Sequence, residues 1–191
     1  MRRTLVILTL IATPLNAQNL RAPADFADIA DPASRSAAMF EEAARVFQHP
    51  RCANCHPVDA RPFQGNDPYP HEPRVVRGEN GMGAAGAQKC WACHTSENYE
   101  ASGVPGDPAW HLAPAEMAWH GKSVAEICAQ LSDPERTGGR DLMGVIEHVE
   151  EDSLVGWGWH PGADREPAPG SAEELGALMR AWVETGAVCP S

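Results

Sequence analysis

Two copies of one cysteine–histidine pattern carry the main chemical signal of this sequence. The pattern reads CANCH over residues 52–56 and CWACH over residues 90–94. C-x-x-C-H is the attachment signature of c-type haem, in which each thiol adds to one vinyl group and the following histidine binds the iron. The sequence therefore predicts two covalent haems. The predicted thioether residues are Cys52, Cys55, Cys90 and Cys93, and the predicted proximal iron ligands are His56 and His94.

Each motif taken singly has rivals, because two C-x-x-C pairs can also bind zinc and one pair can act as a thiol redox centre. The histidine directly after both pairs favours haem over these alternatives. Export of the chain favours it as well, since c-type haem is attached outside the cytoplasm.

The first 17 residues have the three parts of an export signal. Arg2 and Arg3 precede an apolar run at 4–13, and Ala17 is a small residue at the expected cleavage site. The run is shorter than the roughly 20 residues that cross a bilayer. We expect a cleaved signal peptide, a periplasmic protein and no membrane span after cleavage; the alternatives are an uncleaved anchor or a buried strand.

The charge balance narrows the choice of partners. The 191 residues carry a formal net charge of −11, which argues against nucleic acid and anionic membranes, since both attract basic surfaces. An acidic surface favours a redox protein partner with a basic docking patch. Aromatic residues make up only 6 % of the chain, so a cofactor is expected to fill part of the interior.

Cys128 and Cys189 remain outside the motifs. In an oxidising compartment two leftover cysteines usually pair, which predicts a disulfide between them. The alternative is that one of them is a thiolate ligand to iron.

The sixth ligand of each iron decides between two kinds of function. A filled sixth site favours electron transfer, and an open one permits substrate binding. The alternatives for each candidate residue are an exposed loop, a mobile surface side chain or ordinary packing. The candidates are His71 in a proline-stiffened loop, Met82 between glycines, Met117 in an apolar proline loop and His148 beside the apolar stripe of a helix.

The elements that position these residues are predicted to be helices joined by long Gly- and Pro-rich loops. Apolar residues recur at helical spacing near 32–48, 124–131, 140–150 and 171–186. Ser123 and Glu126 form a capping-box pattern. We expect a mainly α domain over 31–191 that wraps two covalent haems, after the signal peptide at 1–17 and a flexible leader at 18–30.

A helix before the first motif and an amphipathic helix at the end resemble the class I cytochrome c arrangement. That resemblance implies that Phe40 and Phe47 meet Leu178 and Trp182, where the first and last helices cross. The match covers the two ends of the chain, because the second motif lies between them.

The chain also resembles a family of small dihaem proteins labelled isoquinoline 1-oxidoreductase subunit-like. The resembling strings are HPRCANCHP, RGENGMG, CWACH, LAPAEMAW, GGRDL, EHVEED, LVGWGW and GAVCP. Isoquinoline oxidoreductases themselves are molybdenum hydroxylases, and nothing in this sequence resembles a molybdopterin site. The resemblance implies at most a redox partner role.

Three functions are consistent with these observations. The first is a periplasmic carrier that passes single electrons between redox partners. The second is a small dihaem enzyme, a peroxidase or a sulfur-compound dehydrogenase, with one open iron. The third is a haem sensor or a structural subunit of a larger dehydrogenase.

Overall fold

The computed structural model describes residues 19–78, 81, 83 and 89–191. The predicted signal peptide and the candidate ligand Met82 lie outside the described residues. The described chain is mainly helical, as predicted, and its α-helices are α1 (Pro32–Phe47), α2 (Pro50–Ala53), α3 (Val124–Leu131), α4 (Leu142–Glu151), α5 (Ser153–Trp157) and α6 (Ala172–Glu184). Two short 3-10 helices, η2 (Pro23–Phe26) and η4 (Cys90–Ala92), accompany them.

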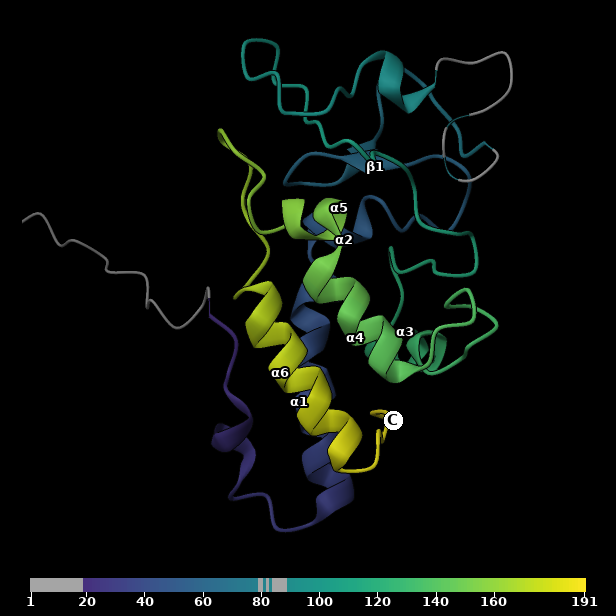
Figure 1. The fold of residues 1–191 in the computed structure, drawn as a ribbon. Coiled ribbons are helices and arrows are strands. Elements are labelled where there is room, and N and C mark those ends of the chain that lie inside the picture. The colour runs from purple at the N-terminus through teal and green to yellow at the C-terminus, as the bar shows by residue number, and fades with distance from the viewer. Residues whose placement is uncertain (1–18, 79–80, 82, 84–88) are drawn as a thin grey trace, which may run out of the picture.

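The long helices α1 and α6 pack side by side and form the centre of the hydrophobic core (Figure 1). Asp31 caps α1 by accepting a hydrogen bond from the Ser34 N–H at 2.8 Å, and Pro32 suits the first helical turn because its missing N–H is not needed there. The rings of Phe40 and Trp182 lie 4.9 Å apart and are fully buried. The helix contact expected from the class I resemblance is therefore present at this pair.

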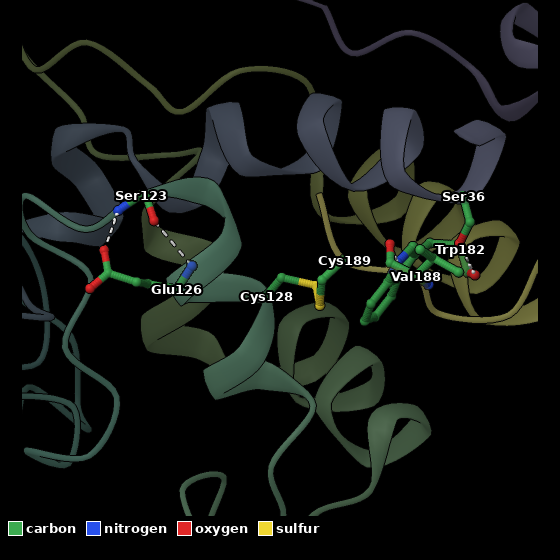
Figure 2. Close-up of a disulfide and its surroundings, with 7 residues drawn as sticks. All are labelled: Ser36, Ser123, Glu126, Cys128, Trp182, Val188 and Cys189. Carbon is green, nitrogen blue, oxygen red and sulfur yellow. Dashed lines mark hydrogen bonds between the residues drawn. A yellow bond between two sulfur atoms is a disulfide. The ribbon is translucent and has the colours of Figure 1, made fainter. Parts of the chain in front are cut away.

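The C-terminal segment is tied back to α1 and α3 (Figure 2). The Ser36 hydroxyl donates to the Trp182 carbonyl at 3.2 Å and accepts from the Val188 N–H at 3.0 Å. The predicted disulfide between Cys128 and Cys189 is present, with the two residues 61 positions apart in sequence.

The ends of α3 and α4 follow from their capping residues. Ser123 and Glu126 form the predicted capping box, with hydrogen bonds of 2.9 and 3.2 Å (Figure 2). Asp152 ends α4 and begins α5, and its side chain accepts hydrogen bonds from the N–H groups of Leu154 and Val155. This double role explains why a helix occurs at 153–157, where the sequence predicted a loop.

Residues 57–78 and 89–112 lie mostly in the loop-rich part above the helices in Figure 1. A two-stranded antiparallel sheet lies there, made of β1 (Phe63–Gln64) and β2 (Tyr69–Pro70), with Phe63 opposite Pro70. No helix in the described part of the chain is long and apolar enough to cross a membrane.

The leader differs from its predicted flexibility over the residues that the structure describes. Phe26 at the end of η2 is 1 % exposed and belongs to the core, and the Arg21 guanidinium lies 4.1 Å from its ring centre. One buried aromatic side chain explains why this short segment is held against α1 and α6, because its apolar area is removed from water.

The disulfide gives a stability prediction. Closing a loop of this length stabilises by roughly 4 kcal/mol in the loop-entropy model. We expect the double variant Cys128→Ala/Cys189→Ala to lose a free energy of unfolding of this order in urea titrations. The prediction would be contradicted if the double variant, the reduced wild type and the oxidised wild type all had the same free energy of unfolding.

Candidate functional site

The first motif lies at the turn that follows α1. His49 caps the short helix α2, and Cys55 donates its N–H to the carbonyl of Cys52 at 3.1 Å. This spacing places both thiols on one side of a helical turn. Burial raises the pKa of Cys52 to about 12 and that of Cys55 to about 11, so both are neutral thiols rather than thiolates at neutral pH.

His56 is held by two contacts that leave one ring nitrogen free. Its Nδ1 lies 2.7 Å from the backbone carbonyl of Met117, and its ring stacks on Trp119 with centres 3.4 Å apart and planes 4° apart. A carbonyl only accepts, so the proton is on Nδ1 and the lone pair of Nε2 is free. Burial lowers the pKa of His56 to about 3. This neutral, oriented imidazole is the form that binds metals.

The second motif repeats this construction. Cys90 begins η4 and Cys93 is exposed. The Nδ1 of His94 lies 2.7 Å from the carbonyl of Pro105, and its ring stacks on Trp110 at 4.5 Å and 9°. Burial lowers the pKa of His94 as well. Both predicted proximal ligands therefore have the same tautomer, the same kind of carbonyl partner and a stacked tryptophan.

One segment supplies the partners of both histidines, and we call residues 105–120 the strap. Its first half holds His94 through Pro105 and Trp110, and its second half holds His56 through Met117 and Trp119. In between, the Ala113 N–H donates to the carbonyl of Cys55 at 3.1 Å. The two sites are thus positioned by a single stretch of backbone.

An apolar cavity opens beside the first motif. Its volume is about 190 Å³, far above the roughly 10–15 Å³ that one water needs. Its lining includes Cys52, Cys55 and His56 from the first motif, Met117 and Trp119 from the strap, Val145, His148 and Val149 from α4, and Leu154 and Trp157 from α5. A flat apolar group attached to the two thiols fits this lining.

Two lining residues carry buried N–H groups without a protein partner. These are Nε of Arg51 and Nε1 of Trp119. A haem carries two propionate carboxylates, which accept such hydrogen bonds, and burial without an acceptor is costly for a donor. The residues present therefore suit a haem at the first motif. The sequence signal for Arg51 is its place directly before Cys52.

His148 belongs to the lining of the same cavity as His56. Its Nδ1 lies 3.5 Å from the Oδ2 of Asp152, one helical turn along the chain. Burial lowers the pKa of His148 and the nearby Asp152 opposes this. A carboxylate beside Nδ1 orients the ring and leaves Nε2 for other contacts, as in many metal sites.

Met117 contacts His56 through its main chain and also belongs to the lining of the cavity. Its carbonyl accepts from the Nδ1 of His56, on the side of that ring that faces away from Nε2. Its side chain is 8 % exposed and packs in the core. This position agrees with the alternative that Met117 is an ordinary packed side chain.

His71 lies close to the second motif. Its ring centre is 5.9 Å from that of His94, with planes 58° apart. Two imidazoles that bind one metal through Nε2, at about 2.0–2.1 Å each, have ring centres roughly 6 Å apart. The Nδ1 of His71 lies 3.0 Å from the Pro73 carbonyl, and the Arg61 guanidinium donates to the His71 carbonyl at 2.8 Å. His71 is therefore fixed with its Nε2 free.

Zinc binding, the main alternative for the cysteine pairs, lacks a ready ligand set in the described residues. No group of three or more His, Cys, Asp and Glu side chains there is arranged to hold a metal ion. The two motif histidines contact different ends of the strap, while Cys55 of the first pair interacts electrostatically with Cys90 of the second.

Comparison with known proteins adds no relative: no family model, no curated protein and no solved structure matches this chain.

The contact beside Pro105 gives a prediction for the second site. A Cβ on Gly106 would lie 2.2 Å from the carbonyl oxygen of Glu97 and 2.5 Å from that of Thr95. Gly106→Ala must therefore move the backbone that carries the Pro105 carbonyl, at a cost of roughly 1–3 kcal/mol. In the haem-loaded protein that the motifs predict, we expect the electron paramagnetic resonance lines of the haem at His94 to shift.

Gly156→Ala is the matched control, because a Cβ there meets nothing within 4 Å. We expect its lines and stability to match the wild type. Equal spectra for both variants would mean that the Pro105 carbonyl does not set the orientation of His94.

Proposed function

We propose that this chain is an exported dihaem c-type cytochrome that passes single electrons between redox partners. The observation that carries the proposal is the shared arrangement of the two motif histidines. Each has its Nδ1 within 2.7 Å of a backbone carbonyl and its ring stacked on a tryptophan. The same arrangement occurs twice along the strap, each time at the histidine of a C-x-x-C-H motif, and this repetition supports two bound irons over two unrelated structural turns.

The residues of the chain divide the work of holding the cofactors. Cys52 and Cys55 would anchor one haem and Cys90 and Cys93 the other, with His56 and His94 as nitrogen ligands. When bound, each haem supplies an iron that changes between Fe(II) and Fe(III). The apolar lining of the first cavity excludes water from that iron, and the buried N–H groups of Arg51 and Trp119 suit its carboxylates.

His71 and His148 would complete the proposed ligand sets. We assign His71 to the iron of His94, because their ring separation matches two imidazoles on one metal. We assign His148 to the iron of His56, because both histidines line one cavity and Asp152 orients the His148 ring. Two filled sixth sites favour electron transfer over the alternative of a small dihaem enzyme.

The net charge of −11 supports a partner with a basic docking patch. Such an encounter is steered by long-range attraction and weakens with salt. We propose the periplasm as its compartment, where the disulfide is stable.

The test is to produce the protein in cells that attach c-type haem and to record oxidised, reduced and carbon-monoxide-treated spectra. We expect two low-spin haems whose reduced spectra do not change with carbon monoxide. A clear change at one haem would contradict electron transfer with two filled sites and favour the enzyme with an open iron. Protein that contains no covalent haem would overturn the proposal altogether.

The ligand assignments predict separate effects for two histidine variants. His71→Ala and His148→Ala should each convert a different haem to a high-spin, carbon-monoxide-binding state, because each removes one sixth ligand. Near-infrared and resonance Raman spectra distinguish the two states.

Two controls accompany these variants. His160→Ala removes an exposed histidine and should leave both haems low-spin. Met117→Leu keeps the backbone carbonyl that His56 uses, so it should also leave both haems low-spin. A high-spin haem in Met117→Leu, with His148→Ala unchanged, would replace His148 by Met117 as the ligand.

A further inference from the structure

Three aromatic rings connect the two candidate sites. Trp110 stacks on the ring of His94 at 4.5 Å, and Trp157 meets Trp110 edge to face, with ring centres 5.0 Å apart and planes 85° apart. Trp157 also lines the cavity beside Cys52 and Cys55. A continuous series of ring contacts therefore runs from the ligand of the second site to the wall of the first.

A hydrogen-bonded route reaches the same tryptophan. The indole N–H of Trp157 donates to the Asn98 Oδ1 at 3.0 Å, and the Gly106 N–H donates to the same oxygen at 3.0 Å. Gly106 follows Pro105, whose carbonyl lies against His94. Ring contacts through Trp110 and hydrogen bonds through Asn98 thus both link Trp157 to the second site.

Trp157 is not explained by core packing. It is only partly buried and is not among the buried residues of the hydrophobic core, whereas Trp159, two residues later, is 7 % exposed and belongs to that core. Asp152 fixes Trp157 indirectly, because it caps the five-residue helix α5 at whose end the tryptophan lies. The Arg51 guanidinium lies 5.9 Å from the Trp157 ring centre, next to Cys52.

We propose that Trp157, together with Trp110, is the route by which electrons pass between the two sites. The proposal rests on the proposed function. One electron leaves ferrous iron at one site and reduces ferric iron at the other, with no bond or proton change. Electron tunnelling weakens steeply across empty gaps, and ring-to-ring contacts shorten those gaps. The tryptophans act as the medium for the electron and are not themselves oxidised.

The experiment measures electron exchange between the two haems in the holoprotein. A photoreduced flavin delivers one electron, and transient absorption follows its redistribution between haems of different midpoint potential. We expect Trp157→Leu to slow this redistribution severalfold while both midpoint potentials and both sets of low-spin resonance lines stay at their wild-type values. Trp157→Phe keeps a ring at the position and should retain most of the rate.

The control is Tyr69→Leu, which removes an aromatic ring that is 50 % exposed in β2 and lies outside the lining of the cavity. Its exchange rate should equal that of the wild type. Wild-type exchange in Trp157→Leu would overturn the bridge, and so would equal slowing in Tyr69→Leu. If Trp157→Leu loses a haem, two other variants test the bridge. A wild-type exchange rate in Trp157→Phe together with a slower rate in Asn98→Leu supports it. Wild-type rates in both variants overturn it.

This outcome is separate from the fate of the proposed function. Two covalent haems that exchange electrons independently of Trp157 leave the cytochrome proposal intact. A wild-type chain without two haems defeats the cytochrome proposal before the bridge is tested.

Discussion

The hydrogen bonds from Nδ1 of His56 and His94 to backbone carbonyls are the interactions on which the two sites depend. A histidine ring on a flexible turn has two nitrogens and free rotation, so it presents no defined ligand. A carbonyl at 2.7 Å fixes the proton on Nδ1 and the direction of Nε2 together. Both carbonyls come from the strap at 105–120, so the geometry of each site requires that this one segment be correctly placed.

The placement of the strap in turn depends on the helical core. Trp119 packs against Phe47 of α1, with ring centres 5.2 Å apart, as well as against His56. The buried Gln130 of α3 donates to the Ala118 carbonyl at 2.9 Å, and the disulfide fixes α3 to the C-terminal segment. The helical core thus holds the end of the strap, which contacts His56. The beginning of the same strap contacts His94.

The two sites differ in their contact with solvent. The thiols of Cys52 and Cys55 lie beside an apolar cavity that raises their pKa values. Around the second motif Cys93 is exposed and Trp91 is 61 % exposed. In the proposed dihaem carrier, the haem at the second motif would meet the partner and the haem at the first motif would be protected from water.

Local patterns predicted much of the fold but not the contacts that hold the site. Helical periodicity and capping residues such as Asp31 and Ser123 act within a few residues, so the main helices could be expected from the sequence. The carbonyl partner of His56 is 61 residues away, in a loop without periodicity. Every residue has a backbone carbonyl, so the sequence does not indicate which carbonyl binds His56. Met117 could be predicted as a candidate iron ligand through its sulfur, but not as the partner of His56 through its main-chain oxygen.

The most direct measurement is peptide mass spectrometry of the mature protein, produced in cells that attach c-type haem. Proteolysis should yield one peptide with residues 52–56 and another with residues 90–94, each heavier by one haem, and one pair of peptides joined by the Cys128–Cys189 disulfide. Both motif peptides at their unmodified mass, in protein that carries zinc instead, would contradict the assignment of two haem sites.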